Sequence, residues 1–238
     1  MARFERGRVR IEYEERGEGF PVLLVAPGGM RSAMELWSRS PFDPREVLAD
    51  GFRLIAMDQR NAGASTGPVS ASDGWHTFAA DQLALLDHLG VERFHVLGMC
   101  IGGSYGLRLM QAAPERVAAG VLLQPIGHDD NREAFREMFD GWARELAARR
   151  EDVEPTVLEA LRANLFDGDF VFSVDRDFVR GCETPMLILR GNDTYHPARV
   201  SEELAELAPH AELVREWKEG AAVDAAVARV REFLAAHR

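Results

Sequence analysis

The sequence reads FHVLGMCIGGSYGLRLM over residues 94–110, which places Cys100 in a Gly-x-Cys-x-Gly pattern between an apolar strand-like run and a helix-like run. A sharp strand-to-helix turn needs Gly98 and Gly102, because side chains there would collide with the backbone. Such a turn lifts the Cys100 sulfur above the sheet edge. The NH groups of the first helical turn then face the sulfur, and their partial positive charge favours the thiolate. We therefore predict that Cys100 is a nucleophile; the alternative is an inert, buried small side chain.

Apolar strand-like runs alternate with amphipathic helical patterns on both sides of this turn. That alternation is typical of a parallel sheet covered on both faces. The strands are predicted at residues 8–15, 21–27, 52–58, 94–99, 118–125, 185–191 and 211–217. Helical periodicity is clear in DQLALLDHLG before Cys100 and in AAVDAAVARVREFLAAH at the carboxyl end. We expect an α/β fold with a mostly parallel sheet of about seven to eight strands.

Composition limits the organisation of the chain and the partners it can have. The 238 residues are 46% hydrophobic, which suits a single domain over residues 1–238. Lys and Arg total 28 against 39 for Asp and Glu, and the net charge of −11 disfavours binding to nucleic acid or to anionic membranes. We find neither a signal peptide nor an apolar run of about 18 residues. We expect a cytoplasmic protein whose partner is a small-molecule substrate.

The longest interval without a predicted strand spans residues 126–184, where two segments show helical patterns. We expect a short helical cap here, inserted after the sixth strand of the sheet and lying over the site. Its large apolar side chains recur at helical spacing: Phe135, Met138, Phe139 and Trp142. Such a stripe either packs the helix onto its own domain or lines a ligand pocket.

Four motifs, in order, resemble the α/β-hydrolase superfamily over nearly the whole chain. They are VLLVAPGGM, IAMDQRNAGAS, DQLALLDHLGVERFHVLGMCIGG and TPMLILRGNDTYHP. The resemblance implies that the first motif supplies an oxyanion-hole NH, the third carries the nucleophile, and the fourth carries the catalytic acid, Asp193. Within the second motif, we expect Asp58 and Arg60 to form an ion pair that shapes the turn.

Two departures from the family pattern bear on function. The usual elbow nucleophile of the superfamily is serine, and Cys100 resembles the thiol variant of dienelactone hydrolases. A thiol is intrinsically more nucleophilic and needs less help from a base. The family's catalytic histidine lies on a loop after the last strand, but REWKEGAAVDAAVARVREFL (residues 215–234) contains no histidine. The standard Cys-His-Asp order is therefore absent.

A proton acceptor for Cys100 must come from another of the seven histidines. His196 is the favoured candidate because it follows Asp193 by three residues, after a strand and at the edge where open α/β sheets build their sites. Asp193 either orients His196, meets Cys100 by another route, or simply caps the helix that starts near Pro197. His128, beside two aspartates, is the second candidate. The others are expected to be structural or poorly placed: His76, His88, His95, His210 and His237.

The expected chemistry is acyl transfer. The Cys100 thiolate attacks an activated carbonyl, the NH of Ile101 and that of Gly29 or Met30 hold the oxyanion, and water resolves the thioester. Reactive substrates such as lactones, enol esters or thioesters are favoured, and neither a cofactor nor a metal is implied. Two alternatives stay open: a ligand-binding member of the fold without activity, and a lyase or isomerase that forms no acyl-enzyme. The second cysteine, Cys182, lacks elbow glycines and is expected to be structural.

Overall fold

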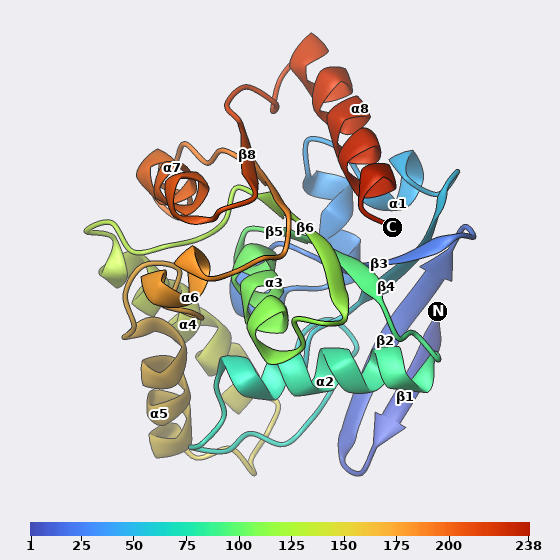
Figure 1. Cartoon of the computed structure of the whole chain (residues 1–238). Helices are drawn as coiled ribbons and strands as arrows, with labels where there is room; N and C mark the ends of the chain where they lie inside the picture. The colour runs from blue at the N-terminus through green and yellow to red at the C-terminus, as the bar shows by residue number, and fades with distance from the viewer.

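The computed structural model describes residues 1–238 and contains one eight-stranded sheet in the order β1-β2-β4-β3-β5-β6-β7-β8 (Figure 1). The strands are β1 (Ala2–Arg6), β2 (Val9–Arg16), β3 (Phe20–Val25), β4 (Phe52–Met57), β5 (Phe94–Met99), β6 (Val117–Leu123), β7 (Met186–Leu189) and β8 (Ala211–Val214). From β4 through β8 every neighbouring pair is parallel, and β1 and β2 form an antiparallel edge. The mostly parallel α/β sheet predicted from the sequence is confirmed.

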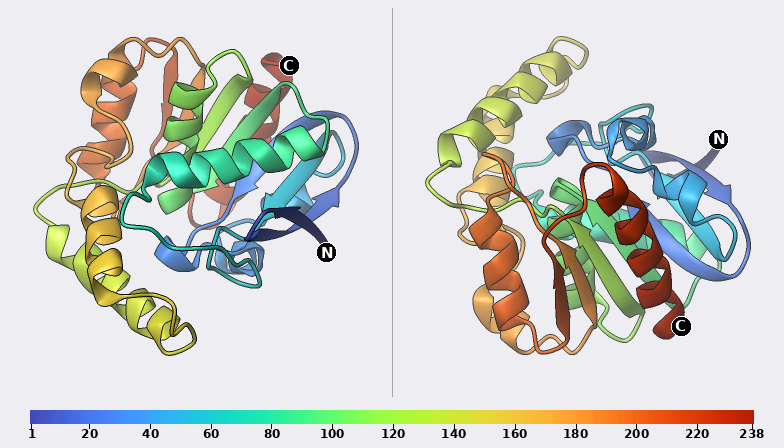
Figure 2. Two further views of the ribbon diagram at one scale, coloured as in Figure 1. Left: turned by 90° about the horizontal axis from the view of Figure 1, so that it is seen from below. Right: turned by 90° about the horizontal axis from the view of Figure 1, so that it is seen from above.

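Helices cover both faces of the sheet (Figure 2). They are α1 (Pro44–Val47), α2 (Trp75–His88), α3 (Ile101–Ala112), α4 (Arg132–Ala147), α5 (Pro155–Phe166), α6 (Arg176–Arg180), α7 (Ala198–Leu207) and α8 (Ala221–Ala236), with two 3-10 helices, η1 (Gly29–Arg31) and η2 (Met34–Arg39). The apolar core has two parts: a larger cluster under α2, α3 and α4, and a smaller one under α8 and η2. No helix combines the length and the apolar composition needed to cross a membrane.

The central strand β5 leads directly to the site. All six of its residues are buried, as expected for a parallel strand that is covered on both faces. It pairs with β3 on one side and with β6 on the other. Because parallel strands end at the same edge, the loops after β3, β5 and β7 all open on one side of the sheet.

Between β6 and β7 the chain forms α4, α5 and α6 (Figure 1). The aromatic side chains of α4 are packing residues, since Phe135, Phe139 and Trp142 are each 1% exposed within the larger core cluster. Met138 is half-buried and lies over the η1 turn, where a Cβ on Gly29 would be 2.5 Å from its Sδ atom. The apolar stripe of α4 therefore packs the helix, and one of its members covers the turn after β3.

The predicted ion pair between Asp58 and Arg60 does not form. The Asp58 carboxylate accepts the backbone NH groups of Met34 at 2.8 Å and Ala64 at 2.9 Å. Arg60 instead pairs with the buried Asp81 of α2, with Nε 2.7 Å from Oδ2. The prediction was wrong because two backbone donors already satisfy Asp58, whereas the buried Asp81 carboxylate accepts from the side chains of two arginines, Arg60 and Arg6.

Candidate active site

Cys100 occupies a strained turn between β5 and α3. Its backbone has φ 61 and ψ −121, a region that residues with a Cβ rarely adopt. A Cβ on Gly98 would lie 2.1 Å from the carbonyl oxygen of Gly102, and a Cβ on Gly102 would lie 2.2 Å from that of Val25. Only glycine fits at these two positions, as the sequence predicted. The NH of Cys100 also donates to Leu123 at the end of β6, 2.9 Å away, which fixes the turn to the sheet.

Asp193 and His196 share the loop after β7. The imidazole Nδ1 lies 2.8 Å from each carboxylate oxygen of Asp193, and His196 is only 8% exposed. Oδ1 of Asp193 also accepts the backbone NH groups of Tyr195 and His196, at 3.0 and 3.1 Å. The following helix, α7, has Pro197 at its start and no side-chain cap. Asp193 therefore orients the imidazole and does not cap α7.

The imidazole of His196 is the side chain with the largest influence on the Cys100 thiol. Its Nε2 atom is buried and has no hydrogen-bond partner. Burial by itself would raise the pKa of the Cys100 thiol, but the nearby His196 imidazole with its positive charge, together with the NH groups of Gly28 and Ile101, lowers the pKa below its ordinary value. Burial would lower the pKa of His196, yet Cys100 and then Asp193 raise it. Both shifts favour a thiolate–imidazolium pair.

Backbone NH groups from two elements approach the sulfur. One belongs to Ile101, at the start of α3, and the other belongs to Gly28, which precedes η1 and has φ 114. The sequence suggested Gly29 or Met30 for the second donor; both lie in η1, directly after Gly28. Their role toward a substrate oxyanion stays a prediction, whereas Gly28 is a neighbour of the sulfur that the sequence reading missed. Its only signal was its place in the Pro-Gly-Gly turn after β3.

The loop after β8, where the family pattern would carry histidine, supports the loop after β7 that carries Asp193 and His196. The indole Nε1 of the buried Trp217 donates to the carbonyl of Arg190 at 2.8 Å, and the Lys218 ammonium contacts the amide oxygen of Asn192. Burial lowers the pKa of Lys218, and the negative charge of Asp193 opposes that shift. The β8–α8 loop therefore holds the chain on either side of Gly191 in place.

The remaining histidines have other partners. His88 packs against Phe4, His95 against Phe20, His128 is 3.2 Å from Asp169, His210 is 3.1 Å from Glu183, His237 bonds the carbonyl of Phe233, and His76 lies beside Thr77. Among the histidines, the structure brings His196 alone to Cys100. Cys182 is buried, and burial raises its pKa. No group of three or more His, Cys, Asp or Glu side chains is placed to hold a metal ion.

Comparison with known protein families matches residues 21–170 to the alpha/beta hydrolase fold. The chain is 32% identical over 124 residues to a fluoroacetate dehalogenase from a Burkholderia species, and the match covers 50% of this chain and 39% of that protein. It is 28% identical over 141 residues to a 2-hydroxymuconate semialdehyde hydrolase from Pseudomonas putida, covering 59% of this chain and 49% of that protein. The chain thus spans less than half the length of these two relatives.

Solved structures match over almost the full chain. A hydrolase from Pseudomonas aeruginosa superposes with a TM-score of 0.73 at 24% identity, covering 98% of this chain and 97% of that chain. The enol-lactonase from Burkholderia xenovorans LB400 gives a TM-score of 0.70 at 22% identity, with 98% of this chain and 100% of that chain covered. At these identities the likeness shows a shared fold.

Proposed function

Because the chain belongs to the alpha/beta hydrolase fold family, we propose that it is a hydrolase that uses Cys100 as its nucleophile and passes through a thioester intermediate. The observation that carries this proposal is the arrangement around the sulfur. A strained elbow presents Cys100 to an imidazole that a carboxylate orients, and two backbone NH groups face the same sulfur. Nucleophile, base and orienting acid are the groups that acyl transfer needs.

The first half-reaction forms the thioester. The Cys100 thiolate attacks the substrate carbonyl carbon, and the negative charge that develops on the carbonyl oxygen is held by backbone NH groups of Ile101 and of the Gly28–Met30 turn. Each such donor lowers the barrier by about 3 kcal/mol. The imidazolium of His196 then gives its proton to the leaving alcohol, enol or thiol as the bond to the carbonyl carbon breaks.

The second half-reaction returns the enzyme to its starting state. Nε2 of His196, now neutral, accepts a proton from water while the water oxygen attacks the thioester carbonyl. The tetrahedral intermediate collapses, the carbon–sulfur bond breaks, and the thiolate leaves beside the restored imidazolium. Asp193 stabilises the imidazolium in both halves because its two oxygens lie 2.8 Å from Nδ1.

The proposed substrates are small activated esters, lactones and thioesters. The Cys100 thiolate is a good nucleophile but also a good leaving group. With an amide substrate, the tetrahedral intermediate would expel the thiolate in preference to the amide nitrogen, whereas an enolate or a thiolate of the substrate leaves readily. The likeness to an enol-lactonase is in keeping with the lactones of this class.

Intact-mass spectrometry with p-nitrophenyl acetate and an acetyl thioester tests the proposal. The wild-type protein is expected to gain one acetyl group within the first turnover, and the label should map to Cys100. Cys100→Ala is expected to take up no label and to lose turnover, while Cys182→Ala should behave as wild type because Cys182 is buried. Equal turnover by Cys100→Ala would refute the covalent mechanism. Binding without any turnover would favour a ligand-binding role.

A further inference from the structure

Gln124 follows the last residue of β6 in a backbone conformation that glutamine rarely adopts. Its φ is 39, in the left-handed region, where residues other than Gly, Asn and Asp are uncommon. Pro125 comes next, and a residue before proline is normally held in an extended conformation with negative φ. Strained residues of this kind persist only where the surrounding structure fixes them, and they gather at functional sites. Cys100, after the neighbouring strand β5, also has a positive φ, 61.

Main-chain pairing places Gln124 directly beside the elbow. The register of β5 and β6 pairs Met99 with Leu123, so Cys100 and Gln124 follow as neighbours on strands that run about 5 Å apart. The residues around Gln124 hold both polar groups of the Cys100 backbone. The carbonyl of Leu123 accepts the NH of Cys100 at 2.9 Å, and the NH of Ile126 donates to the carbonyl of Cys100 at 3.3 Å.

The strand order sets the side of the sulfur on which Gln124 lies. The order is β3-β5-β6-β7, and the NH of Gly28 approaches the sulfur from the β3 side. His196 comes from the loop after β7, on the other side. The NH of Gln124 donates to the carbonyl of Leu189, the last residue of β7, at 2.7 Å. Gln124 therefore lies between the strand end that carries the nucleophile and the loop that carries the base.

The side chain of Gln124 is nearly buried and yet unpaired. It is 8% exposed, and its amide forms no hydrogen bond with the rest of the chain. Neither amide atom is among the unpaired polar atoms that are sealed from the surface, so both reach open space. The seven residues of β6 before Gln124 are all apolar, and burying an amide among such residues costs free energy unless it is hydrogen-bonded. The amide is therefore free to bind a polar group of the reaction.

We propose that Gln124 is a further catalytic residue, which holds the water that hydrolyses the thioester. The inference rests on the proposed function, because this water has a role only if a thioester forms on Cys100. The Oε1 atom of Gln124 accepts one hydrogen of the water and Nε2 of neutral His196 accepts the other, which leaves the water oxygen free to attack the thioester carbon. As the carbon–oxygen bond forms, the second proton passes to His196. Collapse of the intermediate then breaks the carbon–sulfur bond and releases the Cys100 thiolate.

A neutral amide suits this role. It orients the water without adding a charge beside the thiolate–imidazolium pair, and fixing the geometry of a reactant lowers the barrier of the step in which it reacts. Formation of the thioester makes no such demand, because the attacking group is the thiolate itself. Loss of the amide should therefore slow the second half-reaction and spare the first.

Intact-mass spectrometry of the acetyl-enzyme tests the proposal. p-Nitrophenyl acetate loads Cys100, excess reagent is removed by rapid gel filtration, and the loss of the acetyl group is followed with time. Gln124→Met keeps the length of the side chain and removes the amide. This variant is expected to acquire the acetyl group at close to the wild-type rate and to lose it about tenfold more slowly, the effect of one lost hydrogen bond.

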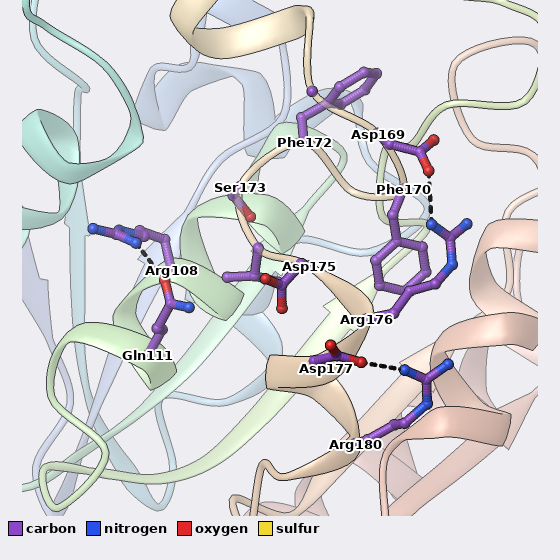
Figure 3. Close-up of a pocket in the computed structure, with 12 residues that line it drawn as sticks. Arg108, Gln111, Asp169, Phe170, Phe172, Ser173, Asp175, Arg176, Asp177 and Arg180 are labelled. Carbon is purple, nitrogen blue, oxygen red and sulfur yellow. Dashed lines mark hydrogen bonds and ion pairs between the residues drawn. The ribbon is translucent and has the colours of Figure 1, made fainter.

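Gln111→Met is the matched control, since it makes the same change at the far end of α3. The Gln111 amide bonds Arg108 beside a cavity of about 630 Å³ that neither Cys100 nor His196 lines (Figure 3). This variant should lose the acetyl group at the wild-type rate. Cleavage by 2-mercaptoethanol is a second readout, because its thiolate attacks the thioester and displaces the Cys100 thiolate without giving up a proton. That cleavage is expected to be equally fast in the wild type and in Gln124→Met.

Gln124→Asn covers the case in which Gln124→Met fails to fold, as judged by circular dichroism. Asparagine tolerates a positive φ, and its shorter side chain cannot hold the water in the same place, so slow loss of the acetyl group is expected again. A wild-type protein that never acquires the acetyl group would refute the proposed function, and this inference with it. If the wild type is acetylated but both Gln124 variants lose the group as fast as Gln111→Met, the inference alone is wrong. Equal slowing of hydrolysis and of cleavage by 2-mercaptoethanol would assign the effect to a disturbed elbow and would also overturn it.

Discussion

At the scale of single residues, the elbow holds a residue with a Cβ in a conformation that costs about 1–3 kcal/mol. Cys100 is kept there by its own NH bond to Leu123 and by glycines that allow β5, α3 and β3 to approach closely. The strain places the sulfur beside His196 and beside the NH groups of Gly28 and Ile101. The local cost of the turn is therefore tied to the position of the sulfur.

Gly102→Ala is expected to destabilise the protein by about 3 kcal/mol or more, because the new Cβ would meet the Val25 carbonyl oxygen at 2.2 Å and backbone cannot move aside cheaply. Gly106→Ala, one turn later in α3, is the matched control. Its Cβ would lie 3.4 Å from Leu122 and 3.5 Å from Val96, so the change should be within about 1 kcal/mol. Urea unfolding measures both. Equal losses would contradict the steric account of the elbow.

His196→Gln is expected to raise the pKa of Cys100. Burial favours the neutral thiol, and removing the imidazole and charge of His196 removes the main group that opposes burial. An ordinary thiol loses its reactivity toward iodoacetamide as the pH falls through about 8.5. In the wild type, alkylation of Cys100 should therefore stay fast below that pH and slow only as the pH falls through the lowered pKa of Cys100. In His196→Gln the midpoint should move up in pH.

His128→Gln is the control for that measurement, because His128 pairs with Asp169 and is not among the groups that act on Cys100. Its pH midpoint should equal that of the wild type. Cys182 adds little background, since it is buried and burial raises its pKa. If His196→Gln leaves the pH midpoint of alkylation unchanged, His196 does not lower the pKa of Cys100 and the prediction is wrong.

At the scale of elements, α4 joins two parts of the site. At its start, the Asn131 amide donates to the carbonyl of Thr194 at 2.6 Å and to that of Gly127 at 3.0 Å, which links α4 to the loop that carries His196. Further along, Met138 lies over Gly29, and Arg31 of η1 pairs with Glu145 at 2.8 Å. A displacement of α4 would therefore disturb both the loop that carries Asp193 and His196 and the turn after β3.

Asn131→Ala is expected to cost about 1–3 kcal/mol, because it leaves a buried carbonyl unsatisfied, and to raise the alkylation midpoint of Cys100 as the His196 loop loosens. Asn164→Ala serves as the control: Asn164 also bonds two carbonyls, but it is exposed and lies in α5. It should lower stability slightly and leave the midpoint in place. Chemical unfolding and the pH profile of alkylation separate the two effects. A shift in both variants would assign the Asn131 effect to general destabilisation.

At the scale of the whole molecule, the predicted elements follow from periodicity, and the missed ones lack it. All seven predicted strands are present, whereas β1 was missed because its burial pattern turns only Phe4 inward in a five-residue run. Spacing also placed His196 beside Asp193, three residues apart on one loop. Long-range partners are not encoded in spacing: the pairing of Arg60 with Asp81 and the approach of the Gly28 NH to Cys100 both depend on how distant elements pack.

His95 connects the core to the pH dependence of folding. It is fully buried in β5, neither ring nitrogen has a partner, and burial lowers its pKa to about 4. Between about pH 6.5 and pH 4 the unfolded chain binds a proton at this residue and the folded chain does not, so His95 lowers stability as pH falls through that window. The loss in the free energy of unfolding should reach on the order of 3 kcal/mol at the acid end of that window.

His95→Phe removes the titrating group while keeping an aromatic ring beside Phe20. Urea unfolding at pH 7.5 and pH 5 should show a smaller loss for His95→Phe than for the wild type, and parallel losses would mean that other groups set the acid sensitivity of the fold.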